Sequence, residues 1–76
     1  MPHIVVKMYP GRTAEQKTKL AEALSRAMIE SIGTKEEVIS VGIEDVTPDD
    51  WMDKVAKPEI QGKSSAIYKK PGYEIA

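Results

Sequence analysis

Apolar and polar residues alternate in two short stretches of the chain. Between these stretches, apolar residues recur with the period of a helix. Residues 2–9 predict a strand, because β-branched side chains are dense there. The residues on one face of that strand are Pro2, Ile4, Val6 and Met8. Residues 38–46 predict a second strand, because apolar side chains alternate with small or polar ones. Its apolar positions are Ile39, Val41 and Ile43.

Residues 14–32, between the two strands, predict an amphipathic helix. Its apolar stripe consists of Leu20, Leu24, Ala27, Met28 and Ile32. We expect Thr13 to cap the first turn together with Gln16, because the two residues have the spacing of a capping box. Gly33 is expected to end the helix, since glycine readily takes the left-handed conformation that follows a last helical turn.

A strand, a helix and a second strand in this order predict an α/β (α+β) fold built on one β-α-β unit. Its crossover should be right-handed, with the two strands parallel. The starts of both strands then lie at the same edge of the sheet, so we expect Ser40 near Pro2. Two strands under one helix are not expected to be stable alone. A second subunit should therefore extend the sheet.

The rest of the chain predicts only short helical structure. Thr47 and Pro48 look like the cap and first residue of a helix that would carry Trp51. We expect Pro58 to interrupt that helix, because proline has no backbone N–H to donate. Residues 59–69 are weakly helical at best. The chain has no internal repeats, and residues 1–76 are interpreted as a single domain.

Composition favours a small protein that associates with itself. A 76-residue chain buries only about 60% of its unfolded surface, and such domains usually need disulfides, a metal or a partner subunit. The sequence has no Cys and one His, so no metal or other cofactor is expected. A net charge of −1 argues against nucleic-acid binding. No signal peptide or membrane span is predicted, which makes the cytoplasm the expected location.

Pro2 is the first candidate for chemistry. If Met1 is removed, the ring nitrogen of Pro2 becomes a free secondary amine, and α-amino groups titrate about two units below lysine. Few other bases compete with it, because the chain lacks Cys and has a single His. The alternative interpretation is that Pro2 merely begins a strand, where proline is tolerated. On position alone this alternative is favoured.

Arg12 is the second candidate, in the turn between the first strand and the helix. A guanidinium there can hold a carboxylate through two hydrogen bonds, although an isolated loop arginine is more often simply solvated. A strand of about eight residues spans roughly 26 Å, so Arg12 cannot reach Pro2 of its own chain. It can reach Pro2 of a partner whose first strand runs antiparallel beside it.

Trp51 and His3 have two possible interpretations each. Trp51 could be a core or interface anchor, or an apolar wall of a small pocket that keeps an amine uncharged. His3 is adjacent to Pro2 but points to the opposite strand face, so we interpret it as structural or surface-exposed rather than catalytic.

Taken together, these motifs resemble the 4-oxalocrotonate tautomerase family. The resemblance rests on Met-Pro, a first strand, Gly11-Arg12-Thr13 and then Glu15-Gln16-Lys17 opening the helix, over residues 2 to about 51. The Trp51 region and the closing residues 69–73 (Lys-Lys-Pro-Gly-Tyr) look like the slightly longer PptA-type members. The resemblance implies a tautomerase that forms a dimer or a trimer of dimers.

The resemblance also implies roles for particular residues. Met1 would be removed and the Pro2 amine would be the catalytic base. Arg12 would bind a substrate carboxylate in a neighbouring subunit, and Trp51 would close the apolar pocket. Ser40 occupies the place of a second arginine in the family, so a monoanionic, arylenolpyruvate-like substrate is expected. We expect a homodimer rather than a hexamer, because residues 52–76 could cap a dimer face. The alternative is a non-catalytic oligomeric module in which Pro2 only starts a strand.

Overall fold

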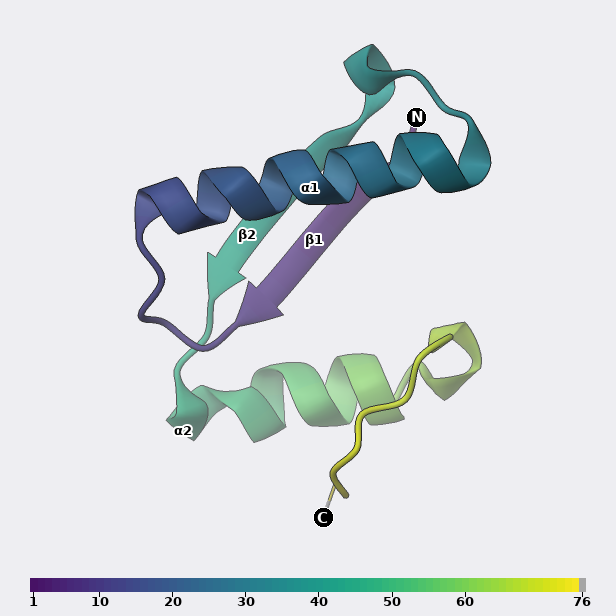
Figure 1. Cartoon of the computed structure of the whole chain (residues 1–76). Helices are drawn as coiled ribbons and strands as arrows, with labels where there is room; N and C mark the ends of the chain where they lie inside the picture. The colour runs from purple at the N-terminus through teal and green to yellow at the C-terminus, as the bar shows by residue number, and fades with distance from the viewer. Residues whose placement is uncertain (76) are drawn as a thin grey trace. The chain divides into compact units, whose positions relative to one another are not determined.

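The computed structural model describes residues 1–75, which fall into two compact units. The first unit, Met1–Asp45, contains strand β1 (His3–Met8), helix α1 (Ala14–Ile32) and strand β2 (Ser40–Asp45). The second unit begins at Val46. In the first unit, α1 lies across one face of the two strands (Figure 1).

The two strands are parallel neighbours, as the β-α-β pattern predicts. The register begins with His3 opposite Ser40 and ends with Met8 opposite Asp45. β2 is shorter than predicted, because Val38 belongs to a 3₁₀ turn at Glu36–Val38. In that turn the Ile39 N–H donates to the Glu36 carbonyl at 3.0 Å, so the backbone is still coiled where alternation alone predicted a strand.

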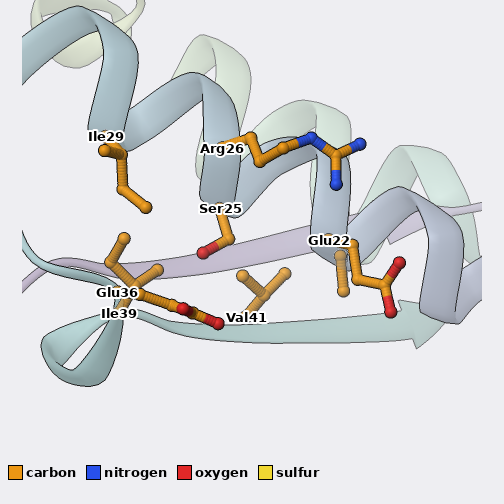
Figure 2. A pocket seen from close by; sticks show the side chains of 8 residues that line it. Glu22, Ser25, Arg26, Ile29, Glu36, Ile39 and Val41 are labelled. Atoms are coloured by element: carbon orange, nitrogen blue, oxygen red, sulfur yellow. The ribbon is translucent and has the colours of Figure 1, made fainter.

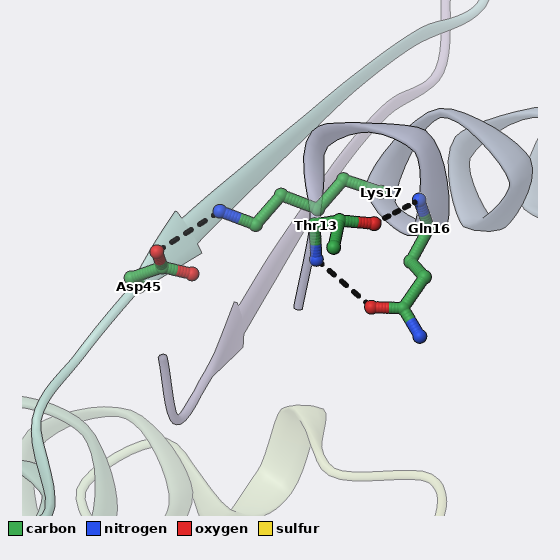
Figure 3. Close-up of polar contacts among 4 residues, drawn as sticks. All are labelled: Thr13, Gln16, Lys17 and Asp45. Atoms are coloured by element: carbon green, nitrogen blue, oxygen red, sulfur yellow. Dashed lines mark hydrogen bonds and ion pairs between the residues drawn. The ribbon is translucent and has the colours of Figure 1, made fainter. Parts of the chain in front are cut away.

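Helix α1 has the bounds that its sequence predicts. The Gln16 N–H donates to the Thr13 hydroxyl at 3.1 Å, and the Thr13 N–H donates to the Gln16 side-chain oxygen at 2.8 Å (Figure 3). This is the expected capping box. Gly33 ends the helix in the left-handed conformation, with its N–H on the Ile29 carbonyl at 2.9 Å. Local sequence signals therefore set both ends of the helix.

The face that α1 turns toward the sheet differs in part from the predicted stripe. Ser25 and Ile29 line the same hollow as Val41 of β2, whereas Ala27 is exposed and Ile32 is 66% exposed. No residue among 1–45 is fully buried, and the apolar side chains there are half-buried or exposed. The first unit thus leaves much apolar surface that one helix on one face does not cover.

A bond between Lys17 and Asp45 joins the start of α1 to the end of β2. The two charged groups lie 2.9 Å apart, and both side chains are partly exposed (Figure 3). Exposed pairs contribute at most about 1 kcal/mol, so this contact orients the two elements more than it stabilises them.

The second unit begins with a short helix and continues as a wider one. Helix α2 (Pro48–Trp51) begins after Thr47, as predicted, but Thr47 makes no side-chain cap bond. A π-helix follows at Met52–Gln61, and a 3₁₀ turn at Ser64–Ala66. No helix in the part of the chain that the structure describes is long and apolar enough to cross a membrane.

The prediction that Pro58 interrupts the second helical segment is wrong, because Pro58 lies inside the π-helix. In an α-helix a proline ring collides with the carbonyl four residues back. A π-helix bonds each residue to the one five back and is wider, which relieves that collision. The Gly62 N–H donates to the Lys57 carbonyl at 2.7 Å, in this five-residue pattern. Val55 and Ala56, at 5% and 0% exposure, are the buried residues of this helix.

Candidate active site

The starts of the two strands bring Pro2 and Ser40 together. The Ser40 N–H donates to the Pro2 carbonyl at 3.2 Å, one position before the paired residues of the sheet begin. This confirms the expectation that a parallel β-α-β unit places these two residues at one edge. Pro2 is half-buried and Ser40 is exposed, so the edge is accessible.

His3 is bonded to Ser40 across the strands. The Nδ1 atom of the imidazole lies 2.6 Å from the Ser40 hydroxyl oxygen, and both residues are exposed. The sequence predicted an exposed His3 but not this contact. The predicted strand pairing could have indicated this contact, because a parallel register that brings Ser40 near Pro2 also sets Ser40 opposite His3. A titratable group and a hydroxyl therefore lie beside Pro2.

Pro2 follows Met1, which is 98% exposed. While the Met1–Pro2 peptide bond is intact, the Pro2 nitrogen is an amide and has no basic lone pair. The exposure of Met1 leaves that bond open to an aminopeptidase. Removal of Met1 would create an amine at the same edge of the sheet as the Ser40 hydroxyl.

Arg12 lies in the loop between β1 and α1, at the opposite end of β1 from Pro2. Gly11 precedes it with a φ of 126°, and Arg12 itself is exposed. The six residues of β1 alone span about 20 Å. Pro2 and Arg12 of one chain are therefore not brought together, as the sequence predicts.

Trp51 is the last residue of α2 and belongs to the second unit. Its indole N–H donates to the Tyr73 hydroxyl at 3.2 Å. Trp51 is half-buried, while Tyr73 is 48% exposed. The bond attaches the closing residues of the chain to α2, a contact that sequence reasoning did not anticipate because the partners are far apart along the chain.

A hollow of about 520 Å³ lies between α1 and β2, away from the predicted site residues (Figure 2). Its lining residues are Ala21, Glu22, Ser25, Arg26, Ile29, Glu36, Ile39 and Val41. Pro2, Arg12, Ser40 and Trp51 do not line it. The hollow therefore belongs to the helix-covered face of the sheet, not to the edge where Pro2 lies.

Comparisons with known proteins identify the class. The profile of a family described as "Tautomerase enzyme" matches residues 2–56. A probable tautomerase of Xylella fastidiosa (strain 9a5c) is 40% identical over 73 residues, which cover 96% of this chain and 89% of that protein. Tautomerase PptA of Klebsiella pneumoniae (strain 342) is 38% identical over 76 residues, 99% of this chain and 100% of that protein. These matches define an isomerase of the tautomerase class.

Solved structures narrow the class to one family. TomN, a 4-oxalocrotonate tautomerase homologue in the tomaymycin biosynthetic pathway, superposes with a TM-score of 0.63 at 36% identity, over 66% of this chain and 77% of TomN. YwhB, another homologue of 4-oxalocrotonate tautomerase, gives 0.61 at 46% identity, over 63% of this chain and 79% of YwhB. The chain belongs to the 4-oxalocrotonate tautomerase family. Membership sets aside the alternative of a non-catalytic module.

Proposed function

We propose that this tautomerase uses the amine of Pro2, freed by removal of Met1, as the general base on a small enol or unsaturated keto acid. The observation that carries the proposal is the edge where Pro2 directly precedes β1 and its carbonyl accepts a hydrogen bond from the Ser40 N–H. The amine lone pair takes the enol O–H proton, and the resulting ammonium delivers a proton to carbon as the C=O bond forms. The amine is regenerated, and the proposed proton transfer consumes no cofactor.

The half-buried position of Pro2 supports a base that is uncharged at neutral pH. Loss of water around an amine disfavours its charged form. Bases that are uncharged near the working pH are the most effective in proton transfer. Trp51, as an apolar wall over the substrate, would strengthen this effect.

A partner subunit would supply Arg12. In the two-stranded sheet, β1 pairs with β2 along one edge. Antiparallel pairing of two β1 strands along their other edges would set the Arg12 loop of one chain beside Pro2 of the other. The absence of a fully buried residue among 1–45 supports such association, and Val5 and Tyr9 on β1 and just after it are 47% and 48% exposed. We propose a homodimer as the smallest form that completes the site.

The proposed substrate is a monoanion of the arylenolpyruvate type. One carboxylate would bind to the guanidinium of Arg12 through two hydrogen bonds. Ser40 offers a hydroxyl and no positive charge, so it would not balance a second carboxylate.

The predicted cytoplasmic location stays a prediction.

Replacing Pro2 tests the base. Intact mass should first show that Met1 is absent from the purified wild type and from Pro2→Ala. Ketonisation of phenylenolpyruvate, followed by absorbance, should then fall by about 10²-fold or more in Pro2→Ala, the size typical for loss of a general base. Pro71→Ala, a proline replaced in the second unit, should keep wild-type activity. Wild-type activity in Pro2→Ala, or full activity in a sample that retains Met1, would contradict the proposal.

A further inference from the structure

The bond between His3 and Ser40 gives the proposed site a second titratable element. The Nδ1 atom of His3 and the hydroxyl oxygen of Ser40 are 2.6 Å apart, a short hydrogen bond between two exposed side chains. Ser40 is at the same time bonded through its backbone to Pro2. His3 thus holds the hydroxyl, and the backbone bond holds Ser40 itself at the edge where Pro2 lies.

A serine hydroxyl has one proton to donate and two lone pairs. When the Nδ1 atom of His3 is unprotonated, it accepts a hydrogen bond from the Ser40 hydroxyl, and Ser40 presents only lone pairs to a ligand. When the imidazole is protonated, Nδ1–H donates to the Ser40 oxygen, and the hydroxyl proton is free for a ligand. A proton on Nδ1 of His3 therefore reverses the hydrogen-bonding role of Ser40.

We propose that His3 is a positioning residue that sets the substrate specificity of this site through Ser40. The inference rests on the proposed function, because it assumes that substrate binds beside Pro2. With Nδ1 of His3 unprotonated, Ser40 turns lone pairs toward the ligand and disfavours a second carboxylate. With charged His3, the Ser40 hydroxyl donates a hydrogen bond to the ligand and favours a second carboxylate. The preferred substrate class therefore changes from monocarboxylate to dicarboxylate enols as the pH falls.

The charges around His3 leave its own protonation as the main variable. Histidine is the side chain that ordinarily changes charge between about pH 5 and 8. On the same sheet face, Lys7 and Glu44 lie four positions along the strands, about 13 Å away, and are 3.9 Å from each other. Glu36 lines the hollow on the helix-covered face, on the other side of the sheet. The proposed amine of Pro2 belongs to the residue next to His3 in the chain.

A ratio of two activities removes the contribution of Pro2. The quantity is kcat/KM for the enol of 4-oxalocrotonate divided by kcat/KM for phenylenolpyruvate, measured from pH 5.5 to 8. Titration of the base of the free enzyme affects both substrates equally and cancels in the ratio. The carboxylates of both substrates stay ionised over this range. In the wild type we expect the ratio to rise roughly tenfold toward low pH, as for a hydrogen bond to a charged group.

Three variants distinguish an effect of the His3–Ser40 hydrogen bond from an effect of charge alone. Ser40→Ala keeps the imidazole and loses the hydroxyl, and its ratio should be independent of pH. His3→Asn keeps a polar partner for Ser40 that does not titrate, so activity should persist with a flat ratio. Glu44→Gln removes a charge from the same sheet face and should keep the wild-type pH dependence. A ratio in Ser40→Ala that still rises as in the wild type would overturn the proposal.

The bond itself can be tested without activity. His3 is the chain's one histidine, so a sample labelled with ¹⁵N gives a single pair of imidazole signals. We expect Nδ1 to be the unprotonated nitrogen at pH 8. A proton on Nδ1 at pH 8 would overturn the proposal. Turnover of neither substrate, with the NMR result as expected, would overturn the proposed function and leave the bond established.

Discussion

At the scale of single residues, Gly11 determines how the chain leaves β1. Its φ of 126° lies in a region that residues with a Cβ rarely adopt. The next residue is Arg12, so the conformation of Gly11 sets where the guanidinium begins. The path of the backbone and the proposed carboxylate site are therefore linked through one glycine.

Gly11→Ala should lower the free energy of unfolding by about 1–3 kcal/mol, the usual cost of a strained backbone conformation. Chemical denaturation at one fixed protein concentration measures this change. Gly72→Ala is the matched control, because Gly72 has no positive φ and no atom lies within 4 Å of an added Cβ. Equal stabilities of the two variants would show that the loop accommodates a side chain at position 11.

At the scale of elements, each helix follows its own hydrogen-bonding pattern. α1 is closed at its start by the reciprocal bonds of Thr13 and Gln16 and at its end by Gly33. The π-helix at Met52–Gln61 ends at Gly62, whose backbone lies close to the carbonyl groups of Lys57 and Pro58. A Cβ on Gly62 would lie 2.6 Å from the Pro58 carbonyl oxygen. The wide helix therefore depends on a residue without a side chain.

Thr13→Ala should reduce stability by about 1 kcal/mol, because it removes the hydroxyl that accepts from Gln16. The measurement is thermal unfolding followed by circular dichroism. Thr18→Ala is the same substitution within the same helix, where the hydroxyl bonds back to the Ala14 carbonyl at 2.9 Å. Since alanine is the stronger helix former, Thr18→Ala should be neutral or stabilising. A larger loss in Thr18→Ala than in Thr13→Ala would contradict the role of the cap.

Sequence alone was enough where the determinants are local. Thr13, Gln16 and Gly33 act on neighbouring residues, and the bounds of α1 follow from them. The π-helix was missed because no short-range rule distinguishes a proline that ends a helix from one held in a wider turn. The bonds of Ser40 with His3 and of Trp51 with Tyr73 join residues distant in sequence. The roles of Pro2, Arg12, Ser40 and Trp51 in catalysis stay predictions.

At the scale of the whole molecule, the proposed site is a property of two chains. One chain holds Pro2 just before β1 and Arg12 beyond its end, too far apart to act on one small substrate. The proposed antiparallel association would make two sites, each with Pro2 from one chain and Arg12 from the other. Activity would then depend on protein concentration as the dimer dissociates.

Mixed dimers test the shared site. Pro2→Ala and Arg12→Ala should each be almost inactive alone. After denaturation and joint refolding, about half of the dimers should combine the two variants and regain one intact site each. Phenylenolpyruvate activity should then recover to roughly a quarter of the wild-type level. Mixing without refolding is the control, and no recovery after joint refolding would contradict a site made across subunits.

The exposed Met1 has a practical consequence for work with this protein. If the base is the nitrogen that follows Met1, anything fused ahead of Pro2 keeps that nitrogen in an amide bond. An affinity tag at the N-terminus would then give a folded, correctly associated and inactive protein until a protease cuts directly before Pro2. A folded sample without turnover is therefore not evidence against the substrate until an intact mass shows that the chain begins at Pro2.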